Sequence, residues 1–223
     1  MRRPPLRLED VPDLNWVAIS QAALPPVIAG RFVVHGTHDR GRIPYGPRAI
    51  LIDAGEAFGT AHHGTTLGCL LAIDRLARNG GIRRVLDLGC GSGVLAIAAA
   101  RAMPQAQVMA SDNDPIAVDV ARANADANGA HRIVTAYAMG LDHPWLRQAA
   151  PFDLIIGNIL AGPLRALAGD VAGSVRRGGH VVLSGILNPE APAVIAAYIA
   201  HGFQVLKRRQ IGEWTTLTLR RRA

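Results

Sequence analysis

Short apolar runs and helical segments alternate along the chain from residue 84 to residue 202. The apolar runs are RVLDLG (84–89), QVMASD (107–112), RIVTAY (132–137), FDLIIGN (152–158) and VVLSGI (181–186). Runs of this length, rich in Val, Ile and Leu, predict strands buried on both faces of a sheet. Between them, residues 92–103, 115–128, 162–175 and 189–202 are typical of helices. The alternation predicts a mostly parallel sheet with helices on both faces.

The two ends of the chain depart from this alternation. Residues 203–221, FQVLKRRQIGEWTTLTLRR, hold two strand-like runs around a Gly-Glu pair with no helix between them. They predict a hairpin that closes the sheet with an antiparallel strand. Upstream, TTLGCLLAIDRLAR (65–78) predicts an amphipathic helix. Residues 1–57 are less regular and rich in proline, so we interpret them as an N-terminal extension ahead of an α/β domain over 58–223.

Composition predicts a folded protein without a membrane segment. Of the 223 residues, 49% are hydrophobic and 18% charged, which supplies a core and argues against disorder. No apolar run reaches the roughly 18 residues of a membrane span, and the basic N-terminus lacks the apolar segment of a secretory signal. Cys69 and Cys90 offer no disulfide framework. We therefore expect reduced thiols and a cytoplasmic protein.

The net charge is +7, and the basic residues gather near the two ends, in MRRPPLR, KRR (207–209) and RRR (220–222). This charge permits an acidic or nucleic-acid partner. Aromatic residues make up only 4% of the chain, so no platform for stacking the bases of single-stranded RNA is visible. A solvated basic surface and a nucleic-acid site both remain open.

A glycine-rich loop, VLDLGCGSG, follows the first of the apolar runs and opens a helix. Gly89, Gly91 and Gly93 allow a tight turn and close approach of a ligand to the backbone. A dinucleotide-binding fingerprint would have glycine at position 94, where this chain has valine. The pattern is instead G-x-G-x-G, preceded by the acidic Asp87.

An acidic residue ends the next strand. Asp112 lies 21 residues beyond Gly91, where a carboxylate can accept both hydroxyls of a ribose. The alternative is that Asp112 caps the following helix, but Asp114 fills that role, with Pro115 at the first helical position. The loop, the acid and the terminal hairpin together indicate an S-adenosylmethionine (SAM) methyltransferase.

Asn158 interrupts the apolar segment FDLIIGNILAGPL just after Gly157. It either ends the strand and caps the next helix, with Pro163 in that helix's first turn, or it lies on the rim where open α/β sheets bind ligands. Elsewhere, His62 and His63 are adjacent and no third ligand recurs at metal spacing, so we predict no metal site. We interpret Cys90 as a small residue beside the ligand, because nothing nearby in the sequence would lower its pKa.

Five segments resemble the ribosomal protein L11 methyltransferases, the PrmA family: FGTAHHGTT, DLGCGSGVLAIAAA, NILAGPL, LSGIL and GEW. The resemblance covers about residues 55–216 and implies a Rossmann-like, seven-stranded class I methyltransferase sheet. Ala61 is a departure, because the family usually has glycine there. The region before residue 58 also looks too short for the family's separate substrate-recognition domain.

The resemblance also implies a site. SAM would be bound by Thr66, Gly89, Asp112 and Asn158, together with Gly91 of the same loop. Asn158 would also act in catalysis, by bridging the methyl donor and the incoming amine.

The expected function is SAM-dependent methylation of amino groups, lysine or N-terminal, of a ribosomal protein, L11 above all. The basic termini could contact ribosomal RNA. The alternatives are a methyltransferase of another protein's lysine or of ribosomal RNA, and a non-catalytic SAM-binding partner of the ribosome. No N-P-P-Y motif is present, which disfavours glutamine or adenine amino groups as acceptors.

Overall fold

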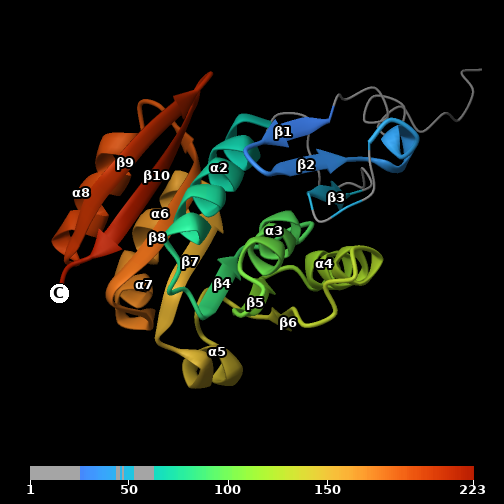
Figure 1. Ribbon diagram of the computed structural model, residues 1–223. Helices are drawn as coiled ribbons and strands as arrows, with labels where there is room; N and C mark the ends of the chain where they lie inside the picture. Colours follow the sequence, from blue (N-terminus) through green and yellow to red (C-terminus); the bar gives the residue numbers. More distant parts are fainter. Residues whose placement is uncertain (1–25, 44–45, 47, 53–62) are drawn as a thin grey trace, which may run out of the picture.

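The computed structural model describes residues 26–43, 46, 48–52 and 63–223, which form two sheets and their covering helices (Figure 1). The larger sheet has the strand order β6-β5-β4-β7-β8-β10-β9. Strand β10 runs antiparallel to both of its neighbours, and the other pairs are parallel. The predicted mostly parallel sheet with a C-terminal hairpin is therefore confirmed. The strands are β4 (Arg84–Leu88), β5 (Gln107–Asp112), β6 (Val134–Tyr137), β7 (Phe152–Asn158), β8 (Val175–Leu187), β9 (Phe203–Ile211) and β10 (Trp214–Arg221).

Helices cover both faces of this sheet, and the sheet separates two apolar clusters, one on each face. Leu154 and Ile156 of β7 belong to one cluster and Ile155 to the other, and all three are fully buried. This is why the strand reads as a continuous apolar run. The first cluster includes α2 (His63–Asn79), α3 (Val94–Ala102) and α4 (Pro115–Ala127), and the second includes α5 (Pro144–Ala149), α6 (Ala161–Ala166), α7 (Ala168–Ser174) and α8 (Ala191–Ala200).

Strand β8 begins earlier than its apolar run predicts. The single helix expected over 162–175 is two short helices, α6 and α7, and β8 starts directly after them at Val175. The Arg-Arg-Gly-Gly stretch (176–179), which separates the predicted helix from the predicted strand, lies inside β8, where Gly178 has φ +73° and the pairing with β7 shifts register. An irregular pairing of this kind has no alternating apolar pattern to reveal it.

The N-terminal region contains a three-stranded sheet that the sequence pattern did not predict. Its strands are β1 (Val27–Ala29), β2 (Phe32–His35) and β3 (Ala49–Leu51), and a short 3-10 helix, η1 (Thr37–Asp39), follows β2. Phe32 and Ile50 are fully buried in the same apolar cluster as α2 and α3. Strands of three or four residues are too short to show a period, so packing against these helices stabilises them.

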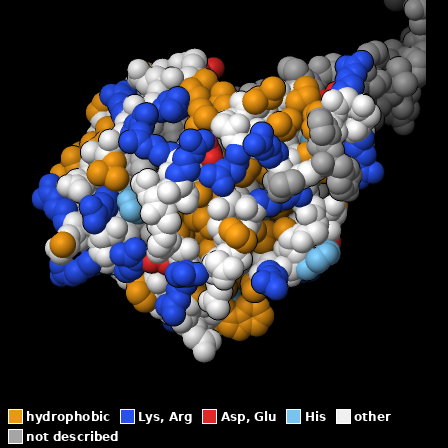
Figure 2. Space-filling model, in the orientation of Figure 1, with side chains coloured by type: hydrophobic (Ala, Val, Ile, Leu, Met, Phe, Trp, Pro, Cys, Tyr) orange, Lys and Arg blue, Asp and Glu red, His pale blue; other side chains and the backbone are white. Residues whose placement is uncertain are grey.

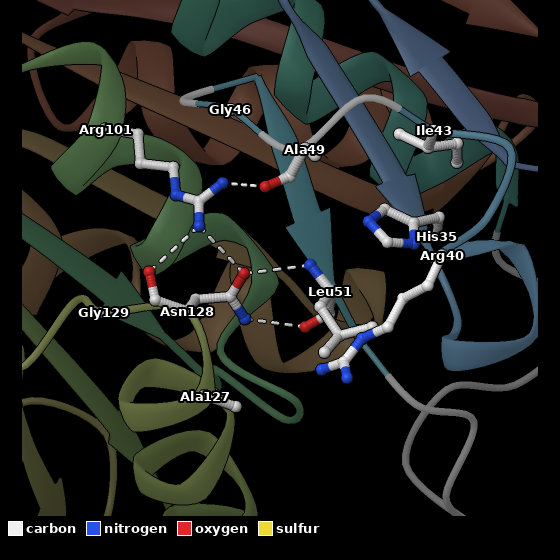
Figure 3. Close-up of a pocket in the computed structure, with 10 residues that line it drawn as sticks. All are labelled: His35, Arg40, Ile43, Gly46, Ala49, Leu51, Arg101, Ala127, Asn128 and Gly129. Atoms are coloured by element: carbon white, nitrogen blue, oxygen red, sulfur yellow. Dashed lines mark hydrogen bonds between the residues drawn. The ribbon is translucent and has the colours of Figure 1, made fainter.

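Asn128, at the end of α4, joins this small sheet to the helices (Figure 3). Its side-chain amide accepts from the Leu51 N–H at 2.9 Å and donates to the Leu51 carbonyl at 2.7 Å. Arg101 of α3 donates to the Asn128 carbonyl and side-chain oxygens, both at 3.0 Å, and to the carbonyl of Ala49. These bonds border a cavity of about 200 Å³ that also contacts His35 and Arg40.

That cavity lies at the C-terminal end of α4, whereas Asp112, the acid predicted to bind the ribose, precedes its N-terminal end. A helix of 13 residues spans roughly 20 Å. The cavity is therefore separate from the predicted site. Across the described ranges, no helix combines the length and the apolar content that crossing a membrane would require.

Candidate active site

The glycine loop leaves β4 at Leu88 and turns through three left-handed glycines. Gly89, Gly91 and Gly93 have φ of +71°, +50° and +75°, which side chains with a Cβ rarely adopt. A Cβ at Gly93 would lie 3.0 Å from that of Ala121, so this glycine permits close packing of α4. A Cβ at Gly91 would meet no atom within 4 Å. The backbone at Gly91 therefore borders open space, where a ligand can approach.

Asp112 holds this loop directly. Its carboxylate accepts the N–H of Gly91 at 2.8 Å through one oxygen and the N–H of Asp114 at 3.1 Å through the other. Asp114 in turn caps α4, accepting the N–H of Ile116 at 2.8 Å with Pro115 at the start of the helix. The predicted division between the two acids is confirmed for the cap. Asp112 is half-buried, and a carboxylate offers about four acceptor positions, so two remain for a ligand.

Asp87 lies buried beneath the loop. One carboxylate oxygen accepts the N–H of Ala96 at 2.9 Å, and the other has no hydrogen-bond partner within the described part of the chain. Burial, and secondarily the charge of Asp112, raises the pKa of Asp87 to about 8, although the Ala96 N–H opposes the shift. A cationic ligand in this region would offset both causes of the shift and favour the ionised form of Asp87.

Asn158 ends β7 beside this loop. It pairs with Ser184 of β8, while the preceding Gly157 pairs with Leu88 of β4. Helix α6 begins only at Ala161, with Leu160 as its N-cap residue and no side-chain cap bond. The alternative that Asn158 caps this helix is therefore wrong. Its half-buried amide makes no hydrogen bond to the described residues, so its donors and acceptor are available at the rim.

Thr66 reaches the same region from α2, where it is buried in the first turn. Cys69 follows three residues later on the same face of the helix. Burial and the charge of Asp87 raise the pKa of the Cys69 thiol, which also hydrogen-bonds to Ser184. The face of α2 that carries Thr66 is therefore turned toward Asp87 and Ser184.

Small residues allow α2 to lie this close. A Cβ at Gly68 would overlap the hydroxyl of Thr216 and lie 2.9 Å from its Cβ. A Cβ at Gly64 would lie 3.1 Å from the carbonyl oxygen of Ile211. The glycines of HGTTLG thus set the distance between α2 and the terminal hairpin.

The cysteines and histidines do not form a second reactive centre in the described ranges. Burial raises the pKa of the Cys90 thiol, and the charges of Asp87 and Asp112 raise it further, so the protonated thiol is a poor nucleophile. No group of three potential metal ligands occurs among the described residues. Ala61, His62 and the basic residues of MRRPPLR lie outside the described ranges.

The structure thus gathers Gly89, Gly91, Asp112 and Asn158 at the carboxyl edge of the sheet, with Thr66 turned toward them from α2. Sequence reasoning gave no role to the free oxygen of Asp87 or to Ser184. The acid before the first glycine and the LSGIL segment were the available signals for them.

A site on this rim, in a sheet of this strand order, defines a class I methyltransferase. Solved methyltransferases share the fold: precorrin-6y C5,15-methyltransferase from Geobacter metallireducens GS-15 gives a TM-score of 0.59 at 16% identity, over 69% of this chain and 87% of that chain. The model of the ribosomal protein L11 methyltransferase (PrmA) family matches residues 1–222. The chain belongs to this family.

Individual relatives support this family assignment. Ribosomal protein L11 methyltransferase of Mesorhizobium japonicum is 48% identical over 217 residues, covering 97% of this chain and 74% of that protein. The same-named protein of Brucella suis is 49% identical over 213 residues, covering 95% and 74%. The crystal structure of ribosomal protein L11 methylase from Lactobacillus delbrueckii subsp. bulgaricus gives a TM-score of 0.75 at 29% identity, covering 89% of this chain and 98% of that one.

Proposed function

We propose that this chain transfers methyl groups from SAM to amino groups of ribosomal protein L11. Family membership supports the reaction class, and the names of its relatives support the substrate. The observation that carries the proposal is the amide of Asn158, which has no partner among the described residues and lies beside the glycine loop. We assign the protein to the cytoplasm, where ribosomes take up their proteins.

The residues present fit SAM. The open space at Gly91 admits a ligand against the loop backbone, and Asp112 keeps acceptor capacity for two ribose hydroxyls. The buried, unpartnered oxygen of Asp87 lies beneath the same loop, and the charge of the cationic end of the cofactor would favour the ionised form of this carboxyl group. Gly89 and Thr66 complete the proposed binding set. Bound here, SAM would supply an activated methyl group.

The chain's main task is to present a neutral amine. A free lysine with a pKa of about 10.4 is neutral in roughly one molecule in 2500 at pH 7, whereas an α-amino group near 7.8 is neutral in about one in seven. Loss of water around a bound lysine, next to a cationic ligand, lowers its pKa. The side-chain oxygen of Asn158 can then accept an amine N–H and leave the nitrogen lone pair free to react.

A methylation assay on purified L11 with radiolabelled SAM tests the proposal. The parent chain should label L11, and Asn158→Ala should lose at least about 100-fold in kcat with its melting temperature nearly unchanged. Asn128→Ala is the matched control, because that asparagine is fully hydrogen-bonded at the far end of α4. It should lose stability and keep its kcat.

Each alternative predicts a different result. Label in another protein or in ribosomal RNA, but not in L11, would show that the labelled molecule is the substrate in place of L11. SAM binding without any label in ribosomal components would indicate a non-catalytic partner. An active Asn158→Ala variant that unfolds more easily would show that Asn158 is structural.

A basic groove supports contact between this chain and ribosomal RNA. Arg75 of α2 and Lys207 and Arg209 of β9 border it, and small residues including Gly68 and Thr216 line it. Figure 2 shows Lys and Arg side chains gathered over α2 and the β9–β10 hairpin. The hollow is only about 20 Å³, too small to anchor an apolar side chain, whereas phosphates bind at the surface. We therefore extend the proposal to L11 presented on ribosomal RNA.

A further inference from the structure

The LSGIL segment contains a glycine whose place in the fold is defined by Ile159. Gly185 in β8 has φ +78°. A Cβ at this position would overlap the carbonyl oxygen of Ile159 and lie 2.8 Å from its carbonyl carbon and 3.1 Å from its nitrogen. All three atoms belong to the backbone, which cannot rotate away as a side chain can. The backbone that follows Asn158 therefore lies against β8 at a distance that only glycine permits.

A second glycine bounds Ile159 from the other side. Gly89, the first residue of the cofactor loop, would place a Cβ in overlap with the Cγ2 methyl of Ile159. Ile159 is thus held between two left-handed glycines, one in the loop after β4 and one in β8. Leu160, the next residue, is fixed as the N-cap of α6, where its carbonyl accepts the N–H of Leu164 at 3.2 Å.

The β8 side of this arrangement is itself anchored. Ser184, which precedes Gly185 and pairs with Asn158, is fully buried. Its hydroxyl lies 2.9 Å from that of Thr216 in β10, and it hydrogen-bonds to Cys69 of α2. Three elements therefore meet at Ser184 and fix its position. The neighbouring Gly185 is held in place with it and contacts the backbone of Ile159, the residue after Asn158.

We propose that Gly185 is a positioning residue for methyl transfer: by admitting the Ile159 backbone, it fixes the Asn158 amide relative to the cofactor loop. This inference rests on the proposed function, because it acts through Asn158. An alanine Cβ at 185 would need its neighbours to retreat by roughly 0.7–1 Å to reach ordinary carbon–carbon contact. A 1 Å displacement of a group that orients a substrate can reduce the rate about 100-fold.

The test compares Gly185→Ala with Gly202→Ala. Gly202 has φ +84°, and a Cβ there would meet no atom within 4 Å, so it reproduces the backbone strain without the displacement. We expect Gly185→Ala to lower kcat by about 10- to 100-fold, with the KM for L11 and the Kd for SAM changed less than about 3-fold. Gly202→Ala should lose melting temperature and keep its kcat.

A second measurement separates this inference from the proposed function. In a sample labelled at the isoleucine methyls and the asparagine side-chain amides, nuclear magnetic resonance should show the Ile159 and Asn158 signals shifted by Gly185→Ala and unmoved by Gly202→Ala. That result requires no activity. Unmoved signals, or an unchanged kcat in folded Gly185→Ala, would overturn the positioning role alone. An inactive parent chain would overturn the proposed function and leave the resonance test valid.

Ile159→Ala provides a variant without left-handed strain. It removes the methyl that faces Gly89 and keeps the backbone contact with Gly185. We expect a kcat loss of about 3- to 10-fold, smaller than that of Gly185→Ala. A larger loss than in Gly185→Ala would place the positioning contact on the Gly89 side and contradict the assignment to Gly185.

Discussion

Replacing Asp112 by alanine separates two contributions of one carboxylate. In the structure it accepts backbone N–H groups of Gly91 and Asp114, and in the proposed complex it also accepts two ribose hydroxyls. Hydrogen bonds to a charged group contribute about 1.5–3 kcal/mol each, with partial compensation by water when one is lost. Loss of the ligand bonds should therefore weaken SAM binding by about 2–4 kcal/mol, or roughly 30- to 1000-fold.

The same substitution also destabilises the ligand-free protein. The two backbone bonds are part-buried and exposed, so their loss should lower the free energy of unfolding by about 1–2 kcal/mol. Asp114→Ala is the matched control, because it removes a helix cap two residues away, at a cost of about 1 kcal/mol. Its Kd for SAM should remain within about 3-fold of the parent value.

Titration calorimetry at 25 °C gives the Kd values, and urea denaturation without ligand gives the stabilities. The expected result is that Asp112→Ala loses more binding free energy than free energy of unfolding, and that Asp114→Ala does the reverse. An unchanged Kd in Asp112→Ala would refute the ribose assignment. Equal losses of binding in both variants would show that the loop conformation, and not the carboxylate, determines affinity.

Three further predictions follow from the same contacts. Because the pKa of Asp87 is raised above its unfolded value, its protonated form stabilises the fold at low pH, and this contribution declines as pH rises toward 8. The melting temperature of Asp87→Asn, relative to that of the ligand-free parent, should thus increase as the pH rises from about 5 to about 8.5. Parallel plots of melting temperature against pH for the two proteins would contradict this. Asn128→Ala should lower the free energy of unfolding, measured by urea denaturation, by about 2–4 kcal/mol, because it loses its hydrogen bonds to Leu51, Asn124 and Arg101. A decrease of less than about 0.5 kcal/mol would contradict this. The KM for L11 bound to ribosomal RNA should rise from 20 to 200 mM salt, and the double variant Lys207→Gln with Arg209→Gln should flatten that rise; an identical slope would exclude the groove.

Local chemistry made the central strands and the loop predictable. The apolar runs of β4, β5 and β7 reflect burial on both faces, and the left-handed glycines of the loop are needed wherever a strand turns this tightly into a helix. The cap at Asp114 followed from its place before a proline.

Features that depend on distant parts of the chain could not be predicted in this way. The three short N-terminal strands form because Phe32 and Ile50 pack against α2 and α3. The approach of α2, at Cys69, to Asp87 and Ser184 depends on the glycines of this helix meeting the terminal hairpin, about 150 residues further along the chain. Asn158 could be read either as a cap or as a rim residue until the start of α6 was located at Ala161.

Strand β9 has a consequence for how copies of this protein behave in solution. It forms the outer edge of the sheet, and residues 204–208 are exposed on both of its faces. An exposed strand of nine residues would normally invite pairing with another molecule. Consecutive cations at Lys207, Arg208 and Arg209 oppose this, because two such edges brought together repel each other. Neutralising them should therefore promote self-association, and polyanions that cover them should leave this edge without its electrostatic protection.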